Sequence, residues 1–210
     1  MYKRTDTVRA AVKETELESR TIRGFSVCTL GVVQGHSYWM DAITLQQVLE
    51  LGNAITTGVK SRFTHPGLCS DGLGKYLGRA TNFRIENNRV LADLKLPSVS
   101  DTGPEGNLGQ YVLDLATEDP ASFGASIVFA PDERAEKEFV AKNLNKERKF
   151  ISPDKSNIEN FPHVRIAKLR AVDVVDEPAA NPDGFFGDKQ ELLSRGENVL
   201  NWIFSETDLV

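Results

Sequence analysis

The pattern of apolar and polar residues along the chain predicts a mixture of strands and helices. Residues 89–96 alternate between apolar and polar side chains, as on a strand with one buried face, whereas the apolar residues of 108–117 recur at helical spacing. By the same criteria, strands are predicted over 21–33 (one bent strand or two short ones), 59–64, 78–85, 89–96, 122–129 and 164–175, and helices over 44–54 and 108–117. Because these elements do not alternate regularly, we expect an α+β fold, with a mostly antiparallel, closed or partly open β-barrel flanked by helices.

One structural domain is predicted to account for most of the chain. Residues 1–20 form a polar N-terminal segment, and the predicted domain spans 21–188. Within this domain, 132–160 is a charged insertion with few apolar residues. Its first half is compatible with a solvated helix that carries opposite charges four residues apart. Apolar residues at helical spacing predict a helical C-terminal tail over 189–210.

Composition and charge narrow the classes of function. The 210 residues are 40% hydrophobic and 26% charged, which suits one domain with a real core. The net charge of −5 argues against a role that depends on a broadly basic, nucleic-acid-binding surface. No apolar run approaches the roughly 20 residues of a membrane-spanning helix, and the charged N-terminus lacks the apolar stretch of a secretory signal. Cys28 and Cys69 form no metal-binding pattern, so we expect neither a metal nor a cofactor.

Two short segments carry the residue types that acyl-transfer chemistry needs. His65 follows a predicted strand and precedes a glycine-rich loop, a place where rigid elements commonly present catalytic groups. A histidine can take up a proton near neutral pH, and a serine becomes a nucleophile when such a base reaches its hydroxyl. Ser126 follows Gly124 and Ala125, and such small neighbours let a substrate backbone approach closely. A buried hydroxyl bonded to a neighbouring backbone group is the alternative interpretation of Ser126.

Further candidates surround this pair. Ser122 is an alternative nucleophile, although its place after Asp119-Pro120 favours a turn or capping role. Asp173 stands in an apolar string, where a carboxylate is costly unless it is paired. A histidine would account for Asp173, and a nearby arginine, Arg165 or Arg170, would account for it equally well. His163 is a second candidate for the third member of a catalytic group.

Four segments, in order, resemble a known family. They are Gly31-Val32-Val33 with Gly35-His36, Phe63-Thr64-His65-Pro66, the run from Phe123 to Phe129, and the run from Ala171 to Ala179 with Asn181-Pro182. As an ordered set they resemble the head maturation (prohead) proteases of tailed bacteriophages, a family related in fold to the herpesvirus assemblin proteases. The resemblance runs from about residue 21 to residue 184 and implies an assemblin-like fold.

The resemblance also implies roles for individual residues. It makes His65 the general base and Ser126 the nucleophile of a serine endopeptidase. Its third member is an acidic residue or a histidine on the late strand. Relatives commonly carry a glutamate where this chain has Ala171. Asp173 lies two residues further on, so it projects from the same face of a strand and is the expected replacement, with His163 as the alternative. An oxyanion stabiliser is expected as well, with Arg165 as the candidate.

A role in capsid assembly follows from the same resemblance. The enzyme would lie in the host cytoplasm, inside the assembling procapsid, and would cleave scaffold protein, capsid protein precursor and itself. Its partners would be those two proteins and, as an open option, further copies of this chain; no membrane and no direct nucleic-acid role is expected. Two alternatives stay open: a non-catalytic phage structural or scaffold-associated protein that keeps the protease fold, and an unrelated hydrolase of small esters.

Overall fold

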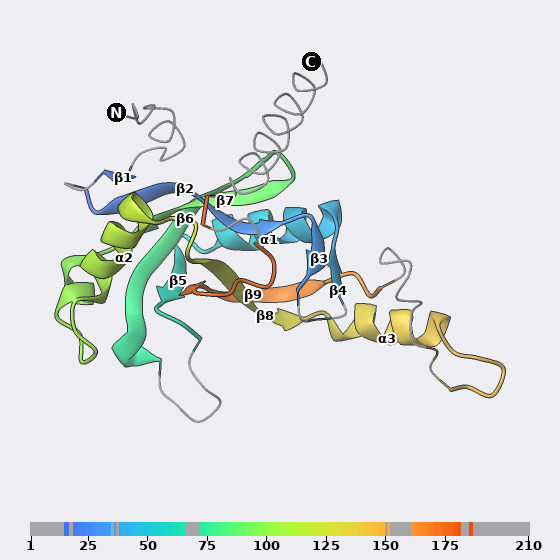
Figure 1. Cartoon of the computed structure of the whole chain (residues 1–210). Coiled ribbons are helices and arrows are strands. Elements are labelled where there is room, and N and C mark those ends of the chain that lie inside the picture. The colour runs from blue at the N-terminus through green and yellow to red at the C-terminus, as the bar shows by residue number, and fades with distance from the viewer. Residues whose placement is uncertain are drawn as a thin grey trace, which may run out of the picture.

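The computed structural model of this chain describes residues 15–16, 19–34, 36, 38–65, 72–149, 151, 161–181 and 185–186 (Figure 1). The strands are β1 (Thr15–Glu16), β2 (Thr21–Thr29), β3 (Gly31–Val33), β4 (Tyr38–Met40), β5 (Val59–Arg62), β6 (Tyr76–Glu86), β7 (Arg89–Lys95), β8 (Gly124–Pro131) and β9 (Ile166–Val175). The α-helices are α1 (Ala42–Ala54), α2 (Leu108–Glu118) and α3 (Glu133–Lys142), and two 3-10 helices are η2 (Leu73–Lys75) and η3 (Ser98–Asp101).

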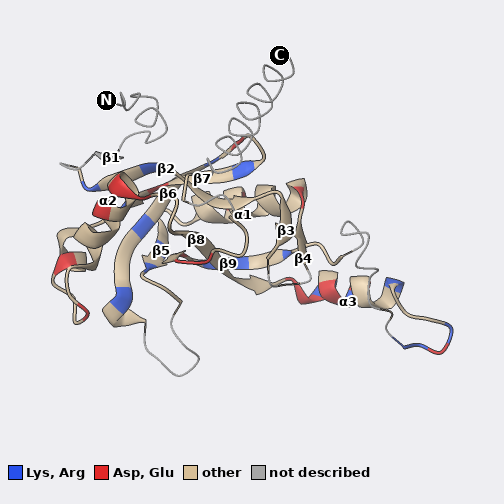
Figure 2. Ribbon diagram, viewed as in Figure 1, with Lys and Arg blue, Asp and Glu red and all other residues tan. Residues whose placement is uncertain are grey.

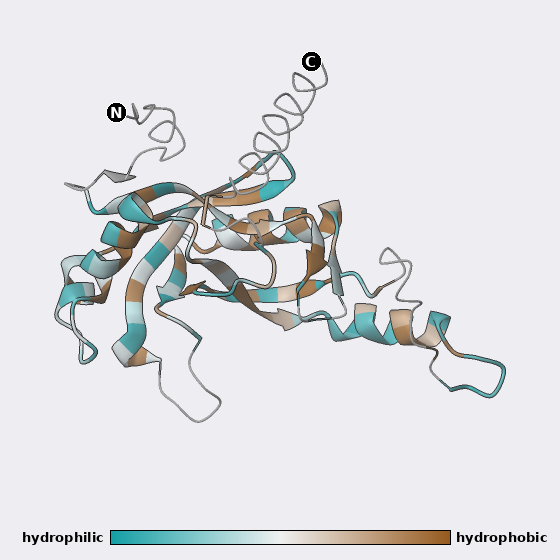
Figure 3. Cartoon of the chain, viewed as in Figure 1, coloured by the Kyte–Doolittle hydropathy of each residue, from teal (hydrophilic) through white to brown (hydrophobic). Residues whose placement is uncertain are grey.

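The strands form three antiparallel sheets. The largest has five strands in the order β1-β2-β7-β6-β5, and β3–β4 and β8–β9 are two-stranded. Asn87 and Asn88 both have positive φ, at 48° and 61°, which gives the tight turn that the sequence predicts between β6 and β7. Figure 3 shows that hydrophobic residues concentrate in the central strands and in α1, where the buried core lies. The expected α+β class is therefore found.

Helix α1 is fixed at its start and packed closely along its length. The side chain of Asp41 accepts a hydrogen bond from the Thr44 backbone N–H, and the Thr44 side chain accepts one from the Asp41 N–H, which is a capping box. Leu45 and Val48 are buried. Near the end of the helix, a Cβ added at Gly52 would lie 2.7 Å from the ring of Phe83, so glycine is needed for this approach between α1 and β6.

Contacts with β5 and β2 are among those that join the β8–β9 pair to the five-stranded sheet. A single parallel bridge, Phe63↔Val174, links β9 to the end of β5. On the other side, the Asn181 side chain donates to both the Val27 carbonyl of β2 and the Ala125 carbonyl of β8. The predicted β-barrel is not supported, because none of the described sheets is closed into a barrel.

The structure describes little of the two ends of the chain but much of the charged insertion. Of the predicted segment 1–20, only 15–16 and 19–20 are described, and the predicted tail 189–210 lies outside the described residues. The insertion begins with α3, which leads away from the rest of the molecule in Figure 1 and has no buried residue. Among the described residues, no helix is long and apolar enough to span a membrane.

Candidate functional site

Ser126 and Asp173 lie directly opposite each other on β8 and β9. Residues that face each other across an antiparallel pair project their side chains to the same face of the sheet, with Cβ atoms about 5 Å apart. Asp173 is fully buried and Ser126 is partly buried. The register of this strand pair therefore places a hydroxyl and a carboxylate on the same face of the sheet.

His65, three residues beyond the end of β5, contacts both side chains. Thr64, the residue before it, has a φ of 62°, which is unusual for a β-branched residue. The Thr64 backbone N–H donates to the Val174 carbonyl at 2.7 Å, and its hydroxyl accepts from Lys75 Nζ at 3.2 Å. These bonds hold a strained turn that directs the chain out of the β5 ladder and brings His65 over β9. Strained backbone of this kind is concentrated at functional sites.

The imidazole of His65 joins the serine to the aspartate. His65 Nε2 lies 3.1 Å from Ser126 Oγ, and His65 Nδ1 lies 2.8 Å from Asp173 Oδ2. In the neutral tautomer that fits both contacts, Nδ1 donates to the carboxylate and Nε2 accepts from the serine hydroxyl. The His65 side chain remains 44% exposed, so a substrate can approach it. This is the order of contacts found in serine hydrolases: nucleophile, base and orienting carboxylate.

Arg62 is a fourth member of the group, and sequence analysis did not identify it. Arg62 Nε donates to Asp173 Oδ1 at 2.9 Å, and Arg62 Nη2 donates to Asp173 Oδ2 at 2.5 Å. A bidentate pair of this kind fixes the plane of the carboxylate as well as its charge. Asp173 Oδ2 is thus shared between Arg62 and His65. From the sequence, Arg165 or Arg170 was expected to pair with Asp173. The signal that could have identified Arg62 is its position on the predicted strand 59–64, three residues before His65.

Asn181 positions the strand that carries Ser126. It is 1% exposed. Its Nδ2 donates to the Ala125 carbonyl at 2.7 Å and to the Val27 carbonyl at 2.8 Å. Its Oδ1 accepts from the hydroxyls of Ser26 at 2.6 Å and Thr29 at 3.2 Å. This buried amide therefore makes all four hydrogen bonds available to it, two donated and two accepted, and they tie β8 to β2 next to the nucleophile.

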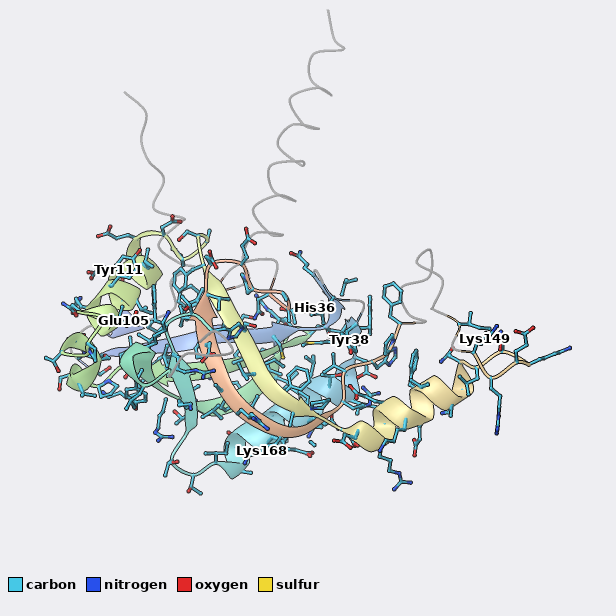
Figure 4. All side chains as sticks on the ribbon, turned by 90° about the horizontal axis from the view of Figure 1, so that it is seen from below. His36, Tyr38, Glu105, Tyr111, Lys149 and Lys168 are labelled. Carbon is cyan, nitrogen blue, oxygen red and sulfur yellow. The ribbon has the colours of Figure 1, made fainter. Side chains whose placement is uncertain are left out.

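An exposed aromatic side chain lies near the base. The rings of Phe63 and Tyr111 make an edge contact with centroids 5.9 Å apart. Phe63 lies two residues before His65, and Tyr111, on α2, is 51% exposed. Figure 4 shows Tyr111 beside Glu105, at the opposite end of the molecule from α3. This pair offers an apolar surface on the α2 side of the site.

His163 and Arg165 belong to a different cluster. His163 Nδ1 lies 3.0 Å from Asp41 Oδ2, and Arg165 donates to both carboxylate oxygens of Asp41, at 2.9 and 2.8 Å. Burial alone would raise the pKa of Asp41, but the hydrogen bonds from Arg165 and Thr44 outweigh it and hold that pKa well below its usual range. Arg165 precedes Asp173 by eight residues, roughly 25 Å along an extended strand. The alternative third member and the oxyanion candidate are therefore not part of the Ser126 site.

The remaining candidates have structural roles. The Ser122 hydroxyl donates to the Asp119 carbonyl at 2.9 Å, which closes the turn before β8. Ala171 is buried opposite Val128, two ladder positions from Ser126. Cys28 is buried in β2, and burial raises the pKa of its thiol to about 12, against a smaller lowering by a hydrogen bond from the Val90 backbone. Cys69 lies outside the described residues.

The described part of the chain holds no group of three or more histidine, cysteine, aspartate or glutamate side chains that could bind a metal ion. The site that the described residues assemble consists of Ser126, His65, Asp173 and Arg62. Comparisons with protein-family models, with curated proteins and with solved structures gave no match for this chain.

Proposed function

We propose that this chain is a serine endopeptidase with Ser126 as nucleophile and His65 as general base. The observation that carries the proposal is the continuous chain of contacts from Ser126 Oγ through His65 to the buried Asp173. A surface histidine has no structural need to contact both a serine and a buried carboxylate through its two ring nitrogens. Acyl transfer needs both contacts, because the base must reach the nucleophile and must itself be oriented.

The reaction follows from these positions. The Ser126 proton passes to His65 Nε2 as Oγ bonds to the carbonyl carbon of the scissile peptide. The resulting imidazolium, stabilised by Asp173, gives that proton to the leaving amine as the C–N bond breaks. A water molecule then attacks the acyl-enzyme ester with His65 again as base, releasing the acid and restoring the Ser126 hydroxyl. Arg62 keeps the Asp173 carboxylate in place throughout.

The biological setting that we propose is maturation of a tailed-phage procapsid. It rests on the resemblance of four segments to the head maturation proteases. Scaffold protein, capsid protein precursor and the enzyme itself would be the substrates, inside the assembling particle in the host cytoplasm. Ala171, which departs from the glutamate of many relatives, is compatible with this proposal because Asp173 supplies a carboxylate from the adjacent inward-facing position of β9. A relationship to the assemblin fold is part of the same proposal.

The test compares the full chain with its Ser126→Ala variant by intact-mass spectrometry, alone and with the cognate capsid and scaffold proteins. The peptidase proposal predicts trimmed products that are absent in Ser126→Ala and unchanged in Ser122→Ala, the matched serine control four residues earlier. The competing hypothesis is a non-catalytic structural protein that keeps the fold. Intact chains and intact partners in every sample would favour that hypothesis and contradict ours.

A further inference from the structure

The charged insertion forms an arm that projects from the end of the molecule opposite to Tyr111. We define the arm as residues 132–149 and 151: Asp132, helix α3 and the turn that follows it. The Ile151 N–H donates to the Asn143 carbonyl at 2.8 Å, and the Asn145 N–H donates to the Lys149 carbonyl at 2.9 Å, which close the tip. Figure 4 shows Tyr38 near the root of the arm and Lys149 at its far end.

The arm exposes large apolar side chains. Val140 is 44% exposed, Leu144 is 38% exposed and Ile151 is 54% exposed. Val140 lies on the helix face that carries Glu133 and Glu136 nearer the root, whereas Leu144 and Ile151 follow the end of α3. Figure 3 shows that α3 and the turn that follows it are mostly hydrophilic, with short hydrophobic stretches. Large apolar side chains exposed together on a projecting arm favour an interaction surface.

Charge is distributed unevenly along the arm, as Figure 2 shows. Two ion pairs form within the helix, Glu133–Lys137 and Arg134–Glu138. A third, Glu147–Lys149, forms at the tip. Within the described part of the chain, no ion pair involves the other charged residues of the arm. Those residues are the acidic Asp132 and Glu136 at the root and the cationic Lys142, Lys146 and Arg148 towards the tip. The root is therefore acidic and the tip is basic.

A hollow of about 250 Å³ lies at the root of the arm. Most of its walls are apolar, and residues from β4, β8 and α3 contribute to them, among them Tyr38, Phe129, Pro131 and Phe139. Among its lining residues, Glu136 is the only carboxylate, and the basic side chains of His163 and Arg165, which both contact Asp41, line it as well. Ligand cavities of drug-sized molecules are roughly 300–1,000 Å³, so this hollow suits one or two apolar side chains. Its apolar walls suit Leu144 or Ile151, which the tip of the arm exposes.

We propose that the arm mediates association with a second copy of this chain, with the basic tip of each arm on the acidic root of the other. The two arms would lie antiparallel about a two-fold axis, so the same contact would form twice. In each contact, Leu144 or Ile151 enters the hollow at the partner root, and Lys146 and Arg148 face Glu133 and Glu136. This association is independent of the proposed peptidase activity.

Paired charge reversals test this arrangement. Sedimentation velocity is measured over a range of concentrations at low and high salt, in the Ser126→Ala background so that cleavage cannot remove the arm. The native arm should give a concentration-dependent dimer that high salt weakens. A root variant, Glu133→Lys with Glu136→Lys, and a tip variant, Lys146→Glu with Arg148→Glu, should each dimerise at least about a hundredfold more weakly, because like charges then meet at both contacts.

The mixture of the two variants is the decisive sample. In a heterodimer the reversed root meets the reversed tip, and the native root meets the native tip, so both contacts become attractive again. We expect equimolar root and tip variants to form a dimer although neither does so alone, which also shows that both are folded. A native chain that stays monomeric throughout, or a mixture no more associated than its components, would overturn the proposal.

Discussion

Ser126 and Asp173 face each other across the β8–β9 ladder, and His65 contacts both, at 3.1 Å from Ser126 Oγ and 2.8 Å from Asp173 Oδ2. The two residues are 47 positions apart in the sequence, and one register of one strand pair brings them together. A shift of that register by one residue would move the pair apart and reverse the face of every side chain on one strand. The site therefore depends on strand pairing as much as on the residues themselves.

Replacing the orienting carboxylate should abolish most of the reactivity while leaving the nucleophile in place. In Asp173→Asn the amide cannot stabilise the imidazolium and favours the wrong tautomer of His65. The rate of acylation should fall by about 10³- to 10⁴-fold. The measurement is the second-order rate constant for labelling by a fluorophosphonate. Asp176→Asn, an exposed aspartate just beyond β9, is the control and should keep the native rate.

Removing Arg62 should affect both stability and reactivity. The Arg62→Ala variant leaves the buried Asp173 carboxylate paired with His65 alone, which should cost about 3 kcal/mol in the free energy of unfolding. The plane of the carboxylate would no longer be fixed, so it would orient His65 less well and the rate of fluorophosphonate labelling should fall. Denaturant titration and the labelling rate give the two results. Lys60→Ala, an exposed neighbour on β5, should change neither, and an unchanged labelling rate in Arg62→Ala would exclude the positioning role.

Local patterns in the sequence predicted most of the elements but could not place them relative to one another. Helical spacing gave α1 and α2 to within two residues at each end, and the strands 78–85 and 89–96 correspond to β6 and β7. The oxyanion candidate Arg165 and the alternative third member His163 lie at Asp41 instead, and the sequence could not show this because their distance from Ser126 depends on the β8–β9 register. Arg62 was missed because its contact with Asp173 spans 111 residues. The predicted barrel was not found because ladder closure depends on long-range pairing that periodicity does not encode.

Asn181 should be essential for holding β8 against β2. Asn181→Ala would leave two backbone carbonyls and two hydroxyls without their partner in a buried region, and we expect the free energy of unfolding to fall by about 3 kcal/mol. Labelling of Ser126 should fall as well, because the adjacent Ala125 loses its anchor. Urea denaturation followed by circular dichroism gives the first quantity. Gln46→Ala, which removes only an exposed side-chain contact on α1, serves as the control.

The Asp41 cluster should make stability depend on pH below about 4. The pKa of Asp41 in the folded chain lies below its value in the unfolded chain, which is about 3.9. The unfolded state therefore binds more protons as the pH falls through this window, and the stabilisation present above it is lost. Denaturant titrations at pH 5 and pH 3 should show this loss. In Asp41→Asn the difference between the two pH values should shrink; an unchanged difference would assign the acid sensitivity to other groups.

The most direct test of the central claim is to locate a covalent adduct on the nucleophile. The full chain is treated with a fluorophosphonate at neutral pH, digested, and analysed by tandem mass spectrometry. We predict a single adduct on Ser126 that disappears in Ser126→Ala and in His65→Ala and persists in Ser122→Ala. An adduct on Ser122 or on another serine, equal labelling of the His65→Ala variant, or no adduct on Ser126 would contradict the account.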